Sequence, residues 1–168
     1  MINGETILRK RYPDLDKKQY QPCGIDLTVG KIEKIITDEK KHRGIINGEK
    51  LNPEYEELSM NAVSANGKLT NVYSLEYNIG YLVTTKEKIY INSHSAQFYE
   101  PRSTLLRQGV SVQTALGDCG FNGHLSFLII NHVPGFYDIS KGERFAQLVD
   151  MRVDGAINEY DGDYQESK

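Results

Sequence analysis

The stretch PRSTLLRQGVSVQTALGDCGFNG, residues 101–123, begins with cationic and hydroxyl side chains and ends in a glycine-rich turn. Guanidinium groups grip phosphate oxygens with paired, charge-assisted hydrogen bonds, and hydroxyls add neutral donors. A packed hairpin needs no such residues, whereas a surface turn with salt-bridged arginines would use the same ones. The sequence therefore predicts either an anion site or a charged surface turn, built from Arg102, Ser103, Thr104 and Arg107.

The end of the same stretch places Asp118 between Gly117 and Gly120. Glycines let the backbone turn tightly and let a ligand approach closely. An aspartate near glycine most often bonds its own backbone in a turn, but it can also act as a general base that orients a water for attack. Phe121 is either a core side chain or an aromatic surface that stacks on a sugar.

Outward from this stretch, short runs of alternating apolar and polar residues recur about every ten residues, as half-buried strands do. Such strands, separated by turn signals, predict an all-β barrel or jelly roll. In the last expected strand Arg144 and Gln147 interrupt an apolar pattern, so Gln147 is either a buried hydrogen-bonding residue or a ligand contact. The expected strands are 24–36, 71–85, 88–100, 110–116, 123–133 and 144–153.

The remaining segments are shorter or more polar. Residues 4–12 are predicted to form a short helix that ends before Pro13, and PEYEELSM, within 52–70, to form a helical turn. The charged segment 38–50 is predicted to be a solvated hairpin tip, because nothing in it resembles a glycine-rich phosphate cradle.

Composition narrows the class of protein. The length of 168 residues suggests one domain. The net charge of −3 argues against broad nucleic-acid binding, which needs a basic face.

No apolar run approaches the roughly 18 residues that span a bilayer, and the N-terminus has no apolar signal core, so a cytoplasmic location is expected. Two separated cysteines and isolated histidines (His94, His124 and His132) predict no metal site.

Five motifs, in order, resemble those of the trimeric dUTPase and dCTP deaminase superfamily, most closely the archaeal-type dUTPases. They are CGIDLTVG (23–30), PRSTLLRQG (101–109), GDCGFNG (117–123), KGERFAQLV (141–149) and YDGDYQES (160–167). The resemblance implies one domain over residues 1–168, with a dUTPase-like jelly-roll or β-clip barrel and few short helices. It also implies a homotrimer with its sites at subunit interfaces, and a tail, 154–168, that closes over the nucleotide.

The resemblance implies hydrolysis of dUTP to dUMP and pyrophosphate, with Asp118 activating the water and Asp26 ordering the surroundings of the site. Phe121 would pack against the deoxyribose, and main-chain groups of residues 113–118 would read the uracil. Mg²⁺ would be held mainly by the triphosphate rather than by a protein cage. The implied nucleotide-binding residues are Arg102, Ser103, Thr104, Arg107, Gln113, Phe121, Gln147, Tyr160, Tyr164 and Gln165.

Two alternatives stay open: a dCTP deaminase, alone or combined with dUTP hydrolysis, and a non-catalytic nucleotide- or partner-binding member of the fold. In the deaminase branch a glutamate serves the base chemistry where this chain has Leu128, and leucine cannot shuttle a proton. Asp118 argues against a non-catalytic role. Asp163 stands where several relatives have lysine, so Mg²⁺ or Lys168 is expected to offset its repulsion from the phosphates.

Overall fold

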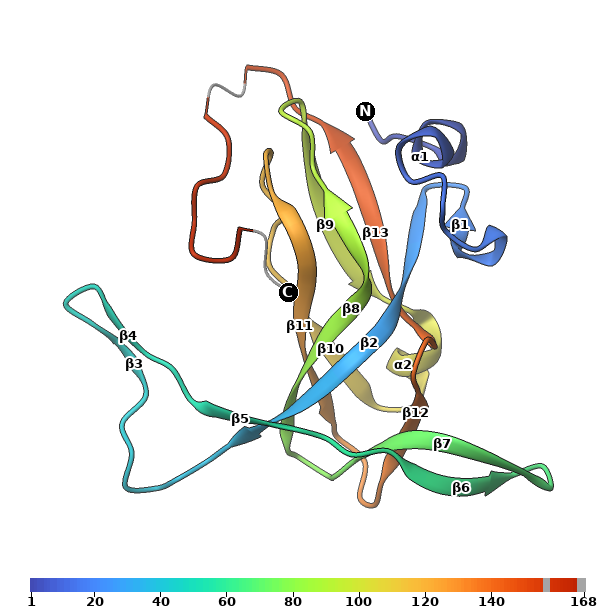
Figure 1. Cartoon of the computed structure of the whole chain (residues 1–168), viewed down its shortest axis with the longest axis vertical. Coiled ribbons are helices and arrows are strands. Elements are labelled where there is room, and N and C mark those ends of the chain that lie inside the picture. Colours follow the sequence, from blue (N-terminus) through green and yellow to red (C-terminus); the bar gives the residue numbers. More distant parts are fainter. Residues whose placement is uncertain (156–157, 166–168) are drawn as a thin grey trace.

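The computed structural model describes residues 1–155 and 158–165. Its main feature is an antiparallel β-sheet that curls into a barrel, with a small second sheet and a projecting hairpin beside it (Figure 1). The strands of the main sheet follow the order β10–β11–β8–β2–β13–β9, and two short strands, β1 and β5, pair with β2. Their bounds are β1 (Tyr20–Gln21), β2 (Gly24–Ile36), β5 (Glu54–Glu57), β8 (Gly80–Tyr90), β9 (Ser95–Pro101), β10 (Val110–Gln113), β11 (Asn122–Asn131) and β13 (Arg144–Arg152).

The segment that follows β10 brings the two edges of this sheet together. The backbones of Gln97 and Gly117 exchange hydrogen bonds of 2.9 and 2.8 Å. Three residues earlier, the Thr114 hydroxyl donates to the carbonyl of Tyr99 at 3.2 Å. The sheet is therefore nearly closed, and the predicted all-β barrel is confirmed.

Alternate side chains of the strands fill the barrel. Three aromatic rings meet edge to face, with centroids 5.3 Å apart for Tyr99 and Phe127 and 5.4 Å apart for Phe127 and Phe145. The first half of β2 departs from the expected alternation, because residues 24–29 are buried on both faces. The short helix η1 (Lys17–Gln19) contacts β2 there, β1 pairs with it as a neighbouring strand, and two polar side chains, Asp26 and Thr28, are buried.

Two antiparallel hairpins account for the polar residues that precede β8. The first joins β3 (Gly44–Ile46) to β4 (Glu49–Leu51), which confirms the hairpin expected in 38–50. The second joins β6 (Asn61–Ala65) to β7 (Lys68–Leu75).

The predicted helical turn at PEYEELSM is wrong, because that segment forms β5 and leads into β6. Both hairpins turn on an Asn-Gly pair whose two residues have positive φ, namely Asn47–Gly48 and Asn66–Gly67. A two-residue turn with positive φ at both positions has the same twist as the strands on either side of it, so an Asn-Gly pair favours a hairpin. The sequence analysis also missed β12 (Tyr137–Ser140), which pairs with β7.

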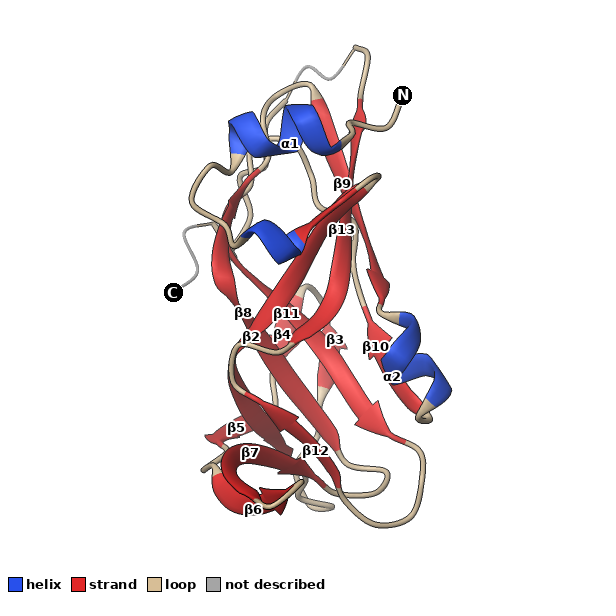
Figure 2. Ribbon diagram, turned by 90° about the vertical axis from the view of Figure 1, so that its right-hand side faces the viewer, coloured by secondary structure: helices blue, strands red, loops and turns tan. Residues whose placement is uncertain are grey.

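The two α-helices found in the described residues lie outside the barrel. Helix α1 (Glu5–Arg11) confirms the predicted N-terminal helix and crosses one end of the barrel, whereas α2 (Ser103–Arg107) lies beside β10 (Figure 2). Arg11, in the last turn of α1, forms an ion pair with Asp150, which is fully buried on β13. No helix in the described part of the chain is long and apolar enough to cross a membrane.

Candidate functional site

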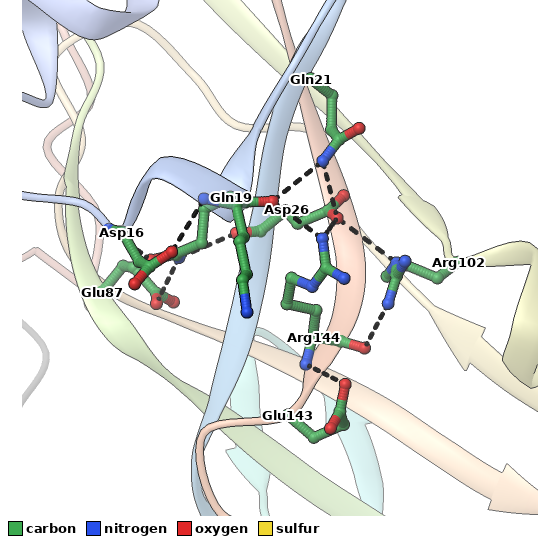
Figure 3. Close-up of polar contacts among 9 residues, drawn as sticks. Asp16, Gln19, Gln21, Asp26, Glu87, Arg102, Glu143 and Arg144 are labelled. Atoms are coloured by element: carbon green, nitrogen blue, oxygen red, sulfur yellow. Dashed lines mark hydrogen bonds and ion pairs between the residues drawn. The ribbon is translucent and has the colours of Figure 1, made fainter.

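The first cluster of predicted site residues surrounds the buried carboxylate of Asp26 (Figure 3). One carboxylate oxygen accepts a hydrogen bond from Arg144 at 3.0 Å and lies 3.4 Å from Nε of Arg102. The side-chain amide of Gln21 donates to the same oxygen at 3.3 Å. Burial raises the pKa of Asp26 above its ordinary value, although the charges of Arg102 and Arg144 partly offset this. Asp26 therefore orients two guanidinium groups that remain partly exposed.

A second buried network fixes the backbone that carries Asp26. The side-chain amide of Gln19 donates to the Asp26 carbonyl at 2.9 Å and to Glu87 at 2.8 Å. The second carboxylate oxygen of Glu87, Oε2, accepts a hydrogen bond from the backbone N–H of Thr28, also at 2.8 Å. Each buried polar group thus has a partner, which keeps β2 in one position.

Strand β13 brings Gln147 opposite Asp26 in the β2–β13 register. Gly24 makes this approach possible, since a Cβ atom there would lie 2.2 Å from the carbonyl oxygen of Leu148 and 2.9 Å from Nε2 of Gln147. Gln147 remains partly exposed. The motifs around residues 23–30 and 141–149 therefore meet in space, as a shared site requires.

Helix α2 begins directly beside this cluster. The backbone N–H of Arg102 donates to the carbonyl of Phe145 at 3.0 Å, which anchors the start of the helix on β13. The side chains predicted to bind phosphate are exposed here, and only Leu105 of the helix is buried. These exposed side chains are Ser103, Thr104 and Arg107.

The second cluster lies at the turn between β10 and β11. Asp118 is exposed, and its carboxylate forms no hydrogen bond or ion pair within residues 1–155 and 158–165. Gly117, just before it, packs against a buried phenol, since a Cβ atom there would lie 2.3 Å from the Tyr99 hydroxyl oxygen. Burial is the main cause that raises the pKa of Tyr99, and the charge of Asp118 adds to it. The turn thus presents an exposed carboxylate whose charge acts on a buried, neutral phenol.

The C-terminal tail lies over this same turn of its own chain. The backbone N–H of Tyr160 donates to the Cys119 carbonyl at 2.7 Å, and the ring of Tyr160 meets that of Phe121 edge to face at 5.8 Å. The side-chain amide of Gln165 donates to the Gly120 carbonyl and accepts from the backbone of Asn122, both at 3.0 Å. The amide thereby pairs with the turn as a neighbouring strand would.

Two glycines make this arrangement sterically possible. Gly120 has a φ of +88°, and a Cβ atom there would lie 2.5 Å from Cβ of Glu159 in the tail. In the tail itself, the Tyr160 ring folds over Gly162, where a Cβ atom would lie 2.4 Å from the phenolic oxygen. The hydroxyl of Tyr160 also accepts from the backbone of Tyr164 at 3.4 Å. The spacing Tyr-x-Gly-x-Tyr-Gln thus has a steric reason.

Within one chain the two clusters are apart. Gly117, next to Asp118, lies opposite Gln97 of β9. Arg102, directly after the end of β9, is five residues beyond Gln97 in the chain. At about 3.3 Å per residue this separates the Asp118 turn from the arginine cluster by roughly 17 Å. No hydrogen bond or ion pair joins the two clusters in residues 1–155 and 158–165.

The sequence analysis missed two residues that act on these clusters. Gln21 holds Asp26, and Lys50 on β4 forms an ion pair with Asp163 in the tail. The expected offset of Asp163 by Lys168 falls on a residue outside the described ranges. Both cysteines, Cys23 and Cys119, are free thiols.

Comparison with known proteins shows the family to which the chain belongs. A family model described as "dCTP deaminase-like" matches residues 3–153. A probable deoxyuridine 5′-triphosphate nucleotidohydrolase of Methanopyrus kandleri is 41% identical over 164 residues, which cover 98% of this chain and 99% of the relative. A protein of the same name from Methanothermobacter thermautotrophicus is 40% identical over 166 residues, 99% of this chain and 100% of the relative.

Among solved structures, a 2′-deoxycytidine 5′-triphosphate deaminase from Agrobacterium tumefaciens aligns with a TM-score of 0.66 at 18% identity. The alignment covers 90% of this chain and 48% of the deaminase chain, so this chain spans about half of that protein. The likeness supports the fold.

Proposed function

The chain belongs to the dCTP deaminase-like family, and we propose that it is a dUTP diphosphatase, which hydrolyses dUTP to dUMP and pyrophosphate. The observation that carries the proposal is the exposed carboxylate of Asp118 in a glycine turn. The tail residues Tyr160 and Gln165 contact that turn at Cys119 and Gly120. The names of full-length relatives at about 40% identity support the substrate.

Asp118 is the proposed general base. Its carboxylate takes a proton from a water whose oxygen attacks the α-phosphorus of dUTP, while the bond from that phosphorus to the bridging oxygen of pyrophosphate breaks. A base must lie within hydrogen-bond reach of the water, and an unpaired, exposed carboxylate can do so. The ring of Phe121, buried beside Asp118, is the proposed surface for the deoxyribose.

The arginine cluster is the proposed triphosphate site. Arg102 supplies charge from a position fixed by Asp26, and Ser103 and Gln147 supply neutral donors. Thr104 and Arg107 lie on the exposed side of α2, within the same motif. Gln113 lies at the end of β10, where the main chain of residues 113–118 is the proposed reader of the uracil.

A homotrimer is the proposed assembly. A single nucleotide must reach both the attacking water and the phosphate-binding side chains, yet these clusters lie about 17 Å apart in one chain by strand spacing. A site formed where the Asp118 turn of one subunit meets the Arg102 cluster of the next removes this separation.

Magnesium is proposed to enter with the nucleotide. The described residues contain no group of three or more histidine, cysteine, aspartate or glutamate side chains that could hold a metal ion. Mg²⁺ bound by phosphates and water needs no such cage. When bound, it neutralises charge on the phosphate oxygens, and Arg102 and Ser103 then have only to fix the phosphates in place.

Leu128 argues against the deaminase alternative. It lies on β11 between Gln113 of β10 and Leu82 of β8 in the sheet register, beside the proposed uracil reader. A leucine there offers no group to move protons at the base.

The test is to incubate the protein with each deoxynucleoside triphosphate and Mg²⁺ and to separate the products. We expect dUMP and pyrophosphate from dUTP, and no ammonia from dCTP. Asp118→Asn should lower turnover by roughly 10²–10⁴-fold while a non-hydrolysable dUTP analogue still binds. Asp14→Asn, which alters an exposed aspartate elsewhere, is the control. Near-normal turnover in Asp118→Asn, or ammonia from dCTP, would contradict the proposal.

A further inference from the structure

The β3–β4 hairpin contacts the C-terminal tail, although the two segments lie far apart in the sequence. Nζ of Lys50 on β4 forms an ion pair with the carboxylate of Asp163. The same ammonium group lies 5.6 Å from the ring centroid of Tyr164, within the range of a cation–π contact. The neighbouring Gln165 is bound to the Asp118 turn. Lys50 thus contacts the two tail residues that directly precede Gln165.

The hairpin contributes little to the core. Every residue of β3 and β4 is exposed, and two of its apolar side chains, Ile45 and Ile46, are 76% and 54% exposed. Figure 1 shows the hairpin projecting from the barrel on the side where the tail runs. Packing in the barrel therefore does not explain its position, whereas a contact with the tail gives it a role.

Charge explains why the tail needs such a contact. Asp163 lies in the segment that would cover a triphosphate, and an unpaired carboxylate there would repel the phosphates. Lys50 lowers the pKa of Asp163, and Asp163 in turn raises that of Lys50, so both groups stay charged at neutral pH. The pair neutralises Asp163, one of the three acidic side chains in residues 158–165.

We propose that Lys50 is a positioning residue for the proposed dUTP site: it neutralises Asp163, seats Tyr164 and so holds the tail over the Asp118 turn. This inference rests on the proposed function for its catalytic meaning only. The contact itself can be tested whether or not the protein hydrolyses dUTP.

The experiment uses the full chain with Lys50→Glu, Asp163→Lys and the double variant that exchanges the two charges. Lys41→Glu is the matched control, because Lys41 forms a similarly exposed ion pair beside the same hairpin, but with Glu54 and not with a tail residue. Hydrogen exchange of the peptide that spans residues 158–165 is measured with and without a non-hydrolysable dUTP analogue. Steady-state dUTP kinetics are measured alongside.

Each single variant should raise exchange in 158–165 by about two- to five-fold, the range that exposed ion pairs produce. The double variant should return exchange to the parent value, and Lys41→Glu should leave it unchanged. The difference should fade at about 1 M salt, where screening is nearly complete. If the parent turns over dUTP, KM should rise in Lys50→Glu more than kcat falls.

Unchanged exchange in the single variants, or a double variant no better than either single one, would overturn the inference. A parent without dUTP turnover that still shows the exchange pattern would overturn the proposed function and leave the hairpin–tail contact standing. The two failures are therefore distinguishable.

Discussion

Replacing Asp26 tests whether its charge or its hydrogen bonds organise the arginine cluster. Asp26→Ala removes the acceptor shared by Arg144, Arg102 and Gln21. One of these contacts, at 3.0 Å, is well formed, and the other two, at 3.4 and 3.3 Å, are long. Since a hydrogen bond to a charged group contributes about 1.5–3 kcal/mol, we expect Asp26→Ala to lose about 2–3 kcal/mol of unfolding free energy.

Asp26→Asn should behave differently, because it keeps the shape and one acceptor oxygen but removes the charge. Burial raises the pKa of Asp26, so the charged form is less favoured in the fold than in water. Removing the charge alone should therefore cost less than about 1 kcal/mol. For a chain of this size each kcal/mol shifts Tm by about 2–4 °C, so Asp26→Ala should lower Tm by about 4–12 °C and Asp26→Asn by less than about 4 °C.

The pH dependence has a defined sign. Because the folded pKa is raised, the folded carboxyl holds its proton to higher pH than the unfolded one, and its contribution to stability is lost as pH rises through the folded pKa. The advantage of the parent over Asp26→Asn should shrink from acid toward neutral pH. The assay is thermal unfolding of all three proteins from pH 3.5 to 7, with KM for dUTP. If Asp26→Asn loses as much stability as Asp26→Ala at pH 7, desolvation does not offset the loss of the charge at this position.

Two further predictions concern the tail. Gly162→Ala would put a Cβ atom 2.4 Å from the Tyr160 hydroxyl oxygen; it should displace the ring and lower kcat/KM for dUTP about tenfold or more, with Tm unchanged. If the tail of Gly162→Ala exchanges its amide hydrogens as slowly as the parent's tail, the Tyr160 ring has moved aside without loosening the tail, which would contradict this prediction. Deleting residues 158–168 should leave a folded trimer, because the segment buries little apolar surface, yet cost much of the activity. A monomeric parent by mass in solution, or full activity after truncation, would remove the basis for a shared, tail-closed site.

Some strands were predictable from the sequence, but the expected strands 71–85 and 88–100 were wrong in their bounds. Each joins parts of two strands, because β7 ends at Leu75, β8 runs over Gly80–Tyr90 and β9 begins at Ser95. The alternation in 24–36 predicted β2 with both of its bounds, although residues 24–29 proved to be buried on both faces. Strand β5 was not predicted, because residues 54–57 are three glutamates and a tyrosine that are all exposed. An exposed strand shows no alternation of apolar and polar residues. The Asn-Gly pairs at residues 47–48 and 66–67 were available as hairpin signals and would have corrected the helical turn expected between them.

The partners of the site residues were harder to predict. The motif identified Asp26, but nothing in the sequence joins Gln21 to its carboxylate. Lys50 and Asp163 lie 113 residues apart and are charged residues of the kind that normally face solvent, so no local pattern pairs them. Asp150 did carry a signal, as an aspartate in the apolar strand AQLVDMRV. Its partners Arg11 and Gln97 come from α1 and β9, and only the fold brings them together.

The way the tail is held bears on how a hydrolase of this kind would turn over. The tail contacts the Asp118 turn through the backbone of Tyr160, the amide of Gln165 and one edge of a ring, with little apolar burial. Ordering a chain segment costs conformational entropy, and such polar contacts exchange readily with water. A tail held this way opens easily, and a triphosphate beneath it would add the contacts that keep it closed. Cleavage to dUMP and pyrophosphate separates the uracil nucleotide from the two outer phosphates. After cleavage no single ligand bridges the Asp118 turn and the Arg102 cluster. Closure would then favour substrate over product, and release would follow from the chemistry itself.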